Sequence, residues 1–343
     1  MTARHRLPDR LAFKQLRTTI GNRLKHVLVT GASGFIGLAL SKALVARGDS
    51  VTAIDLRIGQ DLAELANDND RVVARVCEIT EWQTLVEIIK DNPPDAILHC
   101  AGTVGVLASV QVPCRTMQVN VGGAINLFEA ARLFGVRRII HMSSEETYGE
   151  FQQPAIDETH PQNPLMAYGI SKLAVEHLGR SYKAMHGTEI INMRTCWVYG
   201  PGLPRIRVPK IFVDAAVSGG SCHLPWGEDM AVDHTYIEDV VTGVLLAMDH
   251  VKHPYDAYNL GSGTATKLSK MVEIIRELVP GADISVGAGE YEHGLPSSSA
   301  IAVTKGALIV DRAHEVFGYI PRFNMRDGLA AYIKATRNSK KRL

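Results

Sequence analysis

The sequence predicts an α/β protein with a doubly wound parallel sheet, and three observations support this fold class. Apolar, β-branched runs alternate with stretches of helical character as far as Tyr199. A glycine-rich turn joins the first run to the first helix, and an acidic residue ends the second run. In such a sheet ligands bind at the carboxyl ends of the strands, which is where these features fall.

The expected elements follow the period of the apolar residues. Strands are expected near residues 25–30, 50–55, 72–77, 95–101, 138–143 and 189–195. Helices are expected near residues 35–47, 81–91, 115–134 and 166–186. After Tyr199, prolines and glycines break the pattern. Helices then resume near residues 237–250, 267–278 and 324–337.

The first strand, helix and second strand form a dinucleotide-binding pattern. Residues 27–30 lead directly into the glycine turn, and the second run ends at Asp55, twenty-four residues after Gly31. The turn lets the backbone approach a pyrophosphate at a helix N-terminus, and the acid can accept hydrogen bonds from the adenosine ribose. We expect cofactor contacts from the turn residues Gly31, Ser33, Gly34, Phe35, Ile36 and Gly37. A purely structural glycine loop is the alternative.

Asp55 indicates NAD as the cofactor, because a carboxylate repels the 2′-phosphate of NADP. Arg57 lies close enough in the sequence to keep NADP open as an alternative.

A tyrosine and a lysine four residues apart predict proton-transfer chemistry. Tyr168 and Lys172 fall on one face of the expected helix, one turn apart. An ammonium beside a phenol lowers the pKa of the phenol because it favours the phenolate. Such a phenol can exchange a proton near neutral pH, as the oxidation of an alcohol requires. Ser143 and Ser144 follow an apolar run and place two hydroxyls at the same edge of the sheet.

Composition indicates a soluble enzyme with a small-molecule substrate. The chain has 343 residues and a formal net charge of +1, so no strong field attracts nucleic acid or a membrane surface. No apolar run approaches the ~20 residues of a membrane span. The five cysteines are scattered, which favours free thiols in a reducing cytoplasm. The thirteen histidines show no metal-ligand spacing, and we predict no metal site.

The predicted domains are interleaved. Residues 1–24 carry six cationic side chains against one acid, which predicts a basic N-terminal arm, with an organellar targeting helix as the alternative. An NAD-binding Rossmann-type domain is expected over residues 25–196, with residues 233–258 returning to it. Residues 197–232 and 259–343 are expected to form a smaller substrate-binding lobe.

The ordered motifs of the chain resemble the extended short-chain dehydrogenase/reductase family, also called the NAD-dependent epimerase/dehydratase family. The resemblance runs from about Lys25 to about Tyr332. Each motif alone is weakly specific, whereas the ordered set is very specific. Beyond the glycine turn the motifs are His99-Cys100-Ala101-Gly102, Asn120-Val121 with Asn126-Leu127 after it, Ser143-Ser144 ahead of Tyr148-Gly149, Tyr168 to Lys172, Arg194 with Val198-Tyr199-Gly200-Pro201, Tyr236 to Val240, and Asn259 to Gly263.

The resemblance implies catalytic roles for three residues. Tyr168 would be the general acid/base at the reacting hydroxyl. Lys172 would hold the nicotinamide ribose and lower the pKa of Tyr168. Ser144 would hydrogen-bond the same substrate oxygen.

The resemblance also implies further cofactor contacts. Glu78 and Ile79 resemble the pair that contacts the adenine, with Glu where Asp is commoner. Ala101 and Gly102 would pass beneath the cofactor. Asn120 would be a structural residue near the active site.

Two glutamates directly after Ser144 discriminate among members of this family. Glu145 and Glu146 resemble the acidic pair of nucleotide-sugar 4,6-dehydratases. Oxidation to a ketone acidifies the neighbouring C–H bond, and a carboxylate near the site can remove that proton. We expect Glu146 to be catalytic and Glu145 to contact the substrate, with solvated loop positions as the alternative for both.

Two departures from the family's pattern bear on the substrate. Trp197 stands where nucleotide-sugar members usually have Asn, and Val232 stands where they usually have an Arg that grips the diphosphate. Losing a bidentate phosphate binder is not a conservative change. Arg205, Arg207 and Lys210 are the cations that could supply the charge instead. We expect Trp197 and Val232 to line the substrate site and favour a compact substrate without a nucleotide.

These observations predict an NAD-dependent oxidoreductase that transfers a hydride at a secondary alcohol or ketone carbon of a sugar-like substrate. One alternative is a nucleotide-sugar epimerase or dehydratase, acting on a UDP- or TDP-sugar with transient reduction of NAD. The other is a non-catalytic NAD-binding regulator, against which the intact Ser144, Tyr168 and Lys172 argue.

The resemblance further implies a homodimer. The helices near residues 115–134 and 166–186 resemble the pair that forms a four-helix dimer interface in the family. An apolar stripe at helical spacing is expected there, with intramolecular core as the alternative. The stripe residues are Leu127, Ala130, Ala131, Phe134, Leu173 and His177.

Overall fold

The computed structural model of the chain describes residues 25–289 and 304–340. The basic arm predicted for residues 1–24 lies outside this part. The described residues divide into two compact units. The first contains the described residues up to Ser143, with Met166–Asn192 and Val244–Asp256; the second contains Ser144–Leu165, Met193–Gly243 and the described residues from Ala257 onward. The domain boundaries expected from the sequence stay a prediction.

A parallel seven-stranded sheet confirms the predicted fold class. Its strand order is β10-β7-β5-β4-β1-β2-β3. The order runs outward from β1 in two directions, through β2 on one side and β4 on the other. In sheets of this kind ligands bind beside the strand where the direction reverses. The strands are β1 His26–Thr30, β2 Ser50–Asp55, β3 Val72–Val76, β4 Ala96–His99, β5 Arg138–Ser144, β7 Glu189–Thr195 and β10 Ala257–Leu260.

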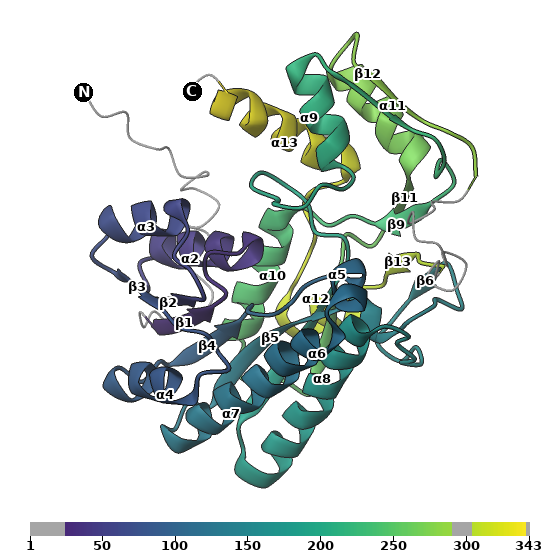
Figure 1. Ribbon diagram of the computed structural model, residues 1–343. Helices are drawn as coiled ribbons and strands as arrows, with labels where there is room; N and C mark the ends of the chain where they lie inside the picture. Colours follow the sequence, from purple (N-terminus) through teal and green to yellow (C-terminus); the bar gives the residue numbers. More distant parts are fainter. Residues whose placement is uncertain (1–24, 290–303, 341–343) are drawn as a thin grey trace. The chain divides into compact units, whose positions relative to one another are not determined.

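Helices cover both faces of the sheet in the first unit. Figure 1 shows α4, α7 and α8 side by side on one face, and α2 and α3 on the other. The core between the sheet and the first group buries Leu28, Ile97 and Ile139 from the strands against Phe128 of α7 and Val175 of α8. The helices of this unit are α2 Phe35–Arg47, α3 Gln60–Asn67, α4 Trp82–Asp91, α5 Val106–Gln111, α6 Pro113–Met117, α7 Gly123–Leu133 and α8 Ala167–His186.

The helix expected over residues 115–134 is interrupted. A π-helix, η2 (Gln118–Gly122), separates α6 from α7. Two short helices of this unit, α3 and α5, were not expected. They are only 8 and 6 residues long and each buries a single residue of its own, Leu62 in α3 and Ser109 in α5, so each is shorter than the window in which an apolar period can be recognised.

The apolar stripe predicted for a dimer contact is wrong at three positions. Leu127, Ala130 and Ala131 are all 0% exposed and belong to the core beneath α7. The exposed apolar side chains of the two helices are instead Ile125 and Leu133 on α7 and Ile170 and Met185 on α8.

The second unit is built from small sheets and helices. Strand β8 pairs with β12 in parallel, β9 pairs with β11 in antiparallel, and β6 pairs with β13 in parallel. Helices α9, α11 and α13 pack against one another (Figure 1). The strands are β6 Ala155–Ile156, β8 Ser221–Leu224, β9 Ala231–Asp233, β11 Ala265–Lys267, β12 Asp283–Val286 and β13 Ala307–Leu308. The helices are η3 Glu145–Thr147, α9 Lys210–Ser218, α11 Leu268–Leu278, α12 Asp311–Phe317 and α13 Met325–Lys340, and α10 (Ile237–Asp249) continues into the first unit.

Helix α9 lies in the stretch where prolines had suggested irregular structure. Pro209 is the residue directly before the helix, where its missing N–H removes no intrahelical hydrogen bond. Proline there marks the start of a helix. Within the residues that the structure describes, no helix is long and apolar enough to cross a lipid bilayer.

Candidate functional site

The glycine turn has the geometry of a close backbone approach. Gly31 has a φ of +67°, and a Cβ atom there would lie 2.7 Å from the backbone nitrogen of Ala101. A Cβ atom on Gly37 would collide with the carbonyl oxygen of Gly31. Helix α2 begins after Gly34 with no side-chain cap. Its first amides are therefore available to an anion, and the first turn contains no acidic residue to compete.

Asp55 is oriented by the backbone of the same turn. Its Oδ2 accepts a hydrogen bond from the amide of Ser33 (3.0 Å), and its Oδ1 accepts one from the amide of Arg57 (3.3 Å). The Ser33 hydroxyl donates to the carbonyl of Arg57 (2.8 Å) and accepts from the amide of Gly59 (3.0 Å). The loop after β2 is thereby fastened to the glycine turn, with the carboxylate between them.

The pair expected at the adenine is held by Thr80, Arg115 and Asn126, to which the sequence had assigned no role. Glu78 accepts from Thr80 (2.8 Å) and pairs with Arg115, and these two hydrogen bonds lower the pKa of its carboxyl. Ile79 is buried in the core, and its carbonyl accepts from the side chain of Asn126 (3.1 Å). Asn126 follows the Asn120-Val121 motif by only a few positions, which was the available signal.

Asn120 joins three segments around the expected cofactor path. Its Oδ1 accepts from the amide of Thr103 (2.7 Å), and its Nδ2 donates to the hydroxyl of Ser171 (2.8 Å). Ser171 in turn donates to the carbonyl of Tyr168 (2.7 Å). A Cβ atom on Gly102 would lie 2.9 Å from the Asn120 oxygen, so the glycine allows this approach. The π-helix places Asn120 where it fixes the first turn of α8.

Tyr168 and Lys172 lie one turn apart on α8, as predicted. The ammonium of Lys172 is 6.0 Å from the centre of the Tyr168 ring. Both side chains are buried, with 8% of Tyr168 and 4% of Lys172 exposed. Burial lowers the pKa of Lys172 to about 8, against the opposing effects of Cys100 and Glu176. The lysine therefore remains mostly protonated at neutral pH and can stabilise a phenolate.

These residues of the first unit fit NAD. The turn offers uncapped helical amides for a pyrophosphate, and Asp55 offers a carboxylate at the end of β2 for ribose hydroxyls. Tyr168 is also a predicted cofactor contact, beside Lys172, and all thirteen residues predicted to contact the cofactor belong to this one unit. Their assignment as cofactor contacts stays a prediction, and the arrangement supports it.

Apart from Tyr168 and Lys172 on α8, the residues predicted to act on the substrate belong to the second unit. Ser144 ends β5 and caps η3, since its hydroxyl accepts from the amide of Glu146 (3.2 Å). Glu145 is 2% exposed, and its Oε2 has no hydrogen-bond partner among the described residues. Burial raises its pKa to about 8, while the Lys305 ammonium acts in the opposite direction. Glu146 Oε2 lies 3.3 Å from Lys305 Nζ.

Trp197 carries a cation on its ring. The guanidinium of Arg207 lies 5.3 Å from the ring centre and donates to the carbonyl of Val198 (2.9 Å). The ring of His234 packs edge to face against the ring of Trp197, with ring centroids 5.5 Å apart. Val232 is 1% exposed in β9. The predicted substrate contacts of Trp197 and Val232 stay predictions, and Arg207 is the one of the three expected replacement cations that lies against Trp197.

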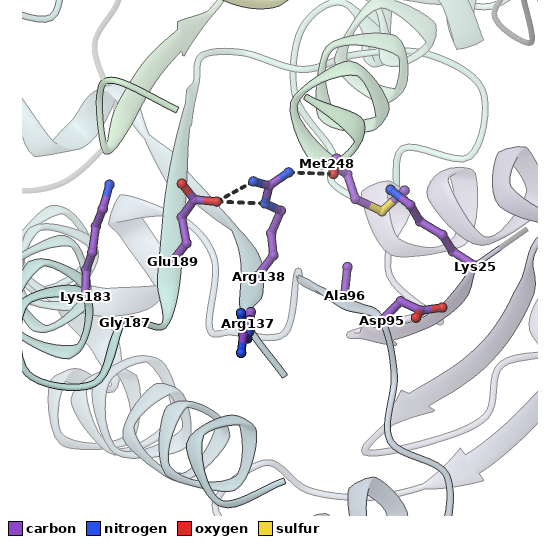
Figure 2. A pocket seen from close by; sticks show the side chains of 9 residues that line it. All are labelled: Lys25, Asp95, Ala96, Arg137, Arg138, Lys183, Gly187, Glu189 and Met248. Carbon is purple, nitrogen blue, oxygen red and sulfur yellow. Dashed lines mark hydrogen bonds and ion pairs between the residues drawn. The ribbon is translucent and has the colours of Figure 1, made fainter. Parts of the chain in front are cut away.

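A hollow of about 540 Å³ opens where strands of the first unit begin. Figure 2 shows Arg138 between Glu189 and the carbonyl of Met248. The Glu189 carboxylate pairs with the Arg138 guanidinium and neutralises its charge. None of the predicted site residues lines the hollow in the described part of the chain. Among residues 25–289 and 304–340, no cluster of histidine, cysteine and acidic side chains could hold a metal ion.

Comparison with known proteins identifies relatives of the whole arrangement. The model of the NAD dependent epimerase/dehydratase family matches residues 27–261. A UDP-glucose 4-epimerase of Mycolicibacterium smegmatis is 29% identical over 319 residues, which cover 91% of this chain and 99% of that protein.

Solved structures of similar fold include enzymes of the same kind as that relative. The UDP-glucose 4-epimerase of Thermotoga maritima, solved with UDP-glucose, superposes with a TM-score of 0.82 at 26% identity, over 92% of this chain and 99% of that one. The UDP-glucose 4-epimerase of Thermus thermophilus, solved with NAD, superposes with a TM-score of 0.79 at 25% identity, also over 92% and 99%.

Proposed function

This chain belongs to the NAD-dependent epimerase/dehydratase family and is an NAD-dependent enzyme, and from that premise we propose that it oxidises a secondary alcohol carbon of a sugar-like substrate. The observation that carries the proposal is the Tyr168–Lys172 pair, buried together one helical turn apart. A non-catalytic regulator would have no need for a buried lysine beside a buried phenol.

Each residue has one task in the proposed reaction. Tyr168 removes the proton of the reacting hydroxyl, and the Lys172 ammonium stabilises the phenolate that does so. Ser144 donates a hydrogen bond to the same substrate oxygen and holds it in place. When bound, NAD supplies the hydride acceptor, its nicotinamide ring. Asp55 and the glycine turn hold the cofactor's other half.

The two glutamates favour elimination of water as a second step. Once the alcohol is a ketone, the neighbouring C–H bond breaks, its proton passes to the Glu146 carboxylate, and its electron pair forms a C=C bond. The hydroxyl on the next carbon leaves as water with the proton of Glu145. The hydride taken in the first step would then return to the carbon that lost its hydroxyl, and a proton would return from Glu146 to the neighbouring carbon, which regenerates NAD and leaves a deoxy ketone. The burial that raises the pKa of Glu145 to about 8 supports a protonated acid at neutral pH. The Lys305 ammonium supports a carboxylate at Glu146.

The substrate is proposed to be a sugar linked to a nucleoside diphosphate. The expectation of a nucleotide-free substrate rested on two positions, the indole of Trp197 and the missing cation at position 232. Arg207, stacked on Trp197, places a cation near the neighbouring His234, which weakens the argument from position 232. The relative from Thermotoga maritima was solved with UDP-glucose, which supports the same class of substrate.

A deuterium experiment separates the possible outcomes. The protein with NAD is incubated in D₂O with UDP- and TDP-sugars, free sugars and sugar acids, and products are analysed by mass spectrometry. Loss of water with deuterium incorporation indicates a dehydratase. A new stereoisomer without deuterium indicates an epimerase, and accumulating NADH indicates a dehydrogenase. No conversion of any class by protein that binds NAD would contradict the proposal.

Assembly and location complete the proposal. We propose a homodimer formed through α7 and α8, supported by the exposed Ile125, Leu133, Ile170 and Met185. Light scattering at micromolar concentration tests it, and a monomer would contradict it. We also propose a cytoplasmic location, which the five free cysteines support.

A further inference from the structure

Lys172 has two hydrogen-bond acceptors behind it in the first unit. Its ammonium donates to the carbonyl of Met142 (2.7 Å) and faces Nε2 of His141 (3.4 Å). Both acceptors come from β5, directly before the two serines. An ammonium carries three protons, so two are directed into the protein and one remains. The direction of the remaining proton therefore depends on these two acceptors.

Asn192 determines which nitrogen of His141 carries the proton. The Asn192 Nδ2 atom lies 2.9 Å from the carbonyl of Asp256, which can only accept, so the amide orientation is set. The amide oxygen of Asn192 then faces His141 Nδ1 at 2.9 Å and must accept a hydrogen bond from an N–H at that nitrogen. A neutral imidazole with its proton on Nδ1 has its lone pair on Nε2. That lone pair points at Lys172.

The surroundings keep this imidazole neutral. His141 is buried, and burial, followed by the charge of Lys172, lowers its pKa well below the usual range. The ring of His99 stacks on it with centroids 5.5 Å apart. The other titratable groups near Lys172 are Cys100 after β4 and Glu176 on α8. A charged imidazole could not accept a hydrogen bond from Lys172, and its positive charge would repel the ammonium.

We propose that His141, held in one tautomer by Asn192, is a positioning residue for Lys172. Nε2 of His141 accepts one N–H of the ammonium and the Met142 carbonyl accepts another, so the third N–H is directed toward the cofactor ribose and Tyr168. The resemblance to the family assigned no role to either residue. The inference rests on the proposed function of Lys172, and it makes the lysine's aim depend on two residues far from it in sequence.

The test uses variants of the full chain and needs no substrate. His141→Phe keeps a ring but removes the acceptor. His141→Gln restores an acceptor near the position of Nε2. Two readouts are measured for each: the Kd for NAD by calorimetry, and the titration of Tyr168, taken as the tyrosinate absorbance that is lost in Tyr168→Phe. A role confined to packing would lower thermal stability and move neither readout.

The expected results are specific. His141→Phe should weaken NAD binding by about tenfold and raise the pH at which Tyr168 ionises by about one unit. His141→Gln should recover most of both. Asn192→Leu, which is close in volume, should act in the same direction with a smaller effect, and the double variant His141→Phe/Asn192→Leu should add nothing. His253→Phe removes another buried imidazole of the same unit and should change neither readout.

Unchanged NAD affinity and Tyr168 titration in folded His141→Phe would overturn the inference. If that variant does not fold, Asn192→Leu decides, and unchanged readouts there overturn it equally. Lys172→Ala separates the two levels of the argument. If Lys172→Ala leaves both readouts unchanged, the proposed function of the lysine fails. If it changes them while the His141 and Asn192 variants do not, only the inference fails.

Discussion

The two units of the molecule differ in how completely their buried polar atoms are satisfied. In the second unit, the Glu145 Oε2, Tyr199 hydroxyl and His234 Nε2 atoms are buried without a hydrogen-bond partner among the described residues. In the first unit His26 Nδ1 is the corresponding atom. By contrast, the polar groups that are predicted to form the site in the first unit, such as Asn120 and Lys172, have hydrogen-bond partners within that unit.

The difference indicates which half is prepared in advance. Buried polar groups in native proteins are nearly always bonded, so these atoms of the second unit are ones that a bound molecule could satisfy. A unit whose network is already closed can hold its cofactor at little ordering cost. We therefore expect substitutions in the first unit to disrupt hydrogen bonds that exist before the cofactor binds. Substitutions in the second unit should affect polar groups that gain partners only when the substrate binds.

The largest expected effect tests the first unit. Tyr168→Phe should reduce turnover by about 10²- to 10⁴-fold, since the phenol transfers a proton. NAD affinity should remain nearly unchanged, because the lost hydroxyl barely touches the cofactor. Lys172→Ala should damage both turnover and NAD affinity. Turnover is measured with the substrate found in the deuterium screen, and NAD affinity by calorimetry. A Tyr168→Phe enzyme with near-normal turnover would remove the mechanism.

The next effect tests the unsatisfied acid of the second unit. The pKa of Glu145 rises from 4.5 to about 8 on folding, so the unfolded chain loses this proton first as pH increases. Stability should therefore fall between about pH 4.5 and pH 8 and level off above that. In Glu145→Gln this decline should be smaller by up to about 5 kcal/mol, measured by urea unfolding at several pH values.

Glu146→Gln is the control for the acid. It removes the ion pair with Lys305 and should leave the decline with pH in place. An equal decline in the native protein and in Glu145→Gln would show that Glu145 is ionised in the folded state. The comparison between the two units would then lose its main example.

A smaller effect concerns the cofactor's adenosine end. Asp55 should favour NAD over NADP by more than about tenfold in affinity, a difference of about 1.4 kcal/mol. Asp55→Ala should narrow this gap, because the carboxylate no longer repels the 2′-phosphate. Calorimetric titration with both cofactors measures it. Equal affinities in the native protein would contradict the assignment and bring Arg57 forward as a phosphate contact.

The last prediction asks what the second unit binds. In saturating NAD, UDP or TDP should raise the unfolding temperature by a few degrees, since a ligand at about 100 times its Kd adds about 2.7 kcal/mol. Arg207→Gln should reduce the shift. Lys210→Gln is a matched control, because Lys210 is already paired with Asp214. Stabilisation by free sugars or sugar acids and not by nucleotides would restore the prediction of a compact substrate.

Much of the first unit could be predicted from local patterns. Strands β1 and β2 were expected within one residue of their bounds, and α2 at Phe35–Arg47 was expected at both ends. These elements follow short, strictly periodic apolar runs, and the glycine turn is a local backbone requirement. The spacing of Tyr168 and Lys172 likewise needs only the period of a helix.

What could not be predicted depends on contacts between distant segments. Lys305 reaches Glu146 from 159 positions along the chain, and Arg207 reaches Trp197 from an irregular loop. Burial also changed the meaning of residues whose spacing was read correctly. Leu127 does lie on an apolar face, but that face is covered by the sheet of its own unit. Spacing gives a direction from the helix axis and does not say what lies there.

The interleaving of the two units limits how such a chain can be recombined. A gene fragment that ends at Ser143 encodes the glycine turn and Asp55 but neither Tyr168 nor Lys172. Exchanging one substrate unit for another would need several simultaneous crossovers, because its stretches alternate with those of the first unit. New specificities in proteins of this layout should therefore arise through point substitutions and short segment replacements, and seldom through the joining of gene halves.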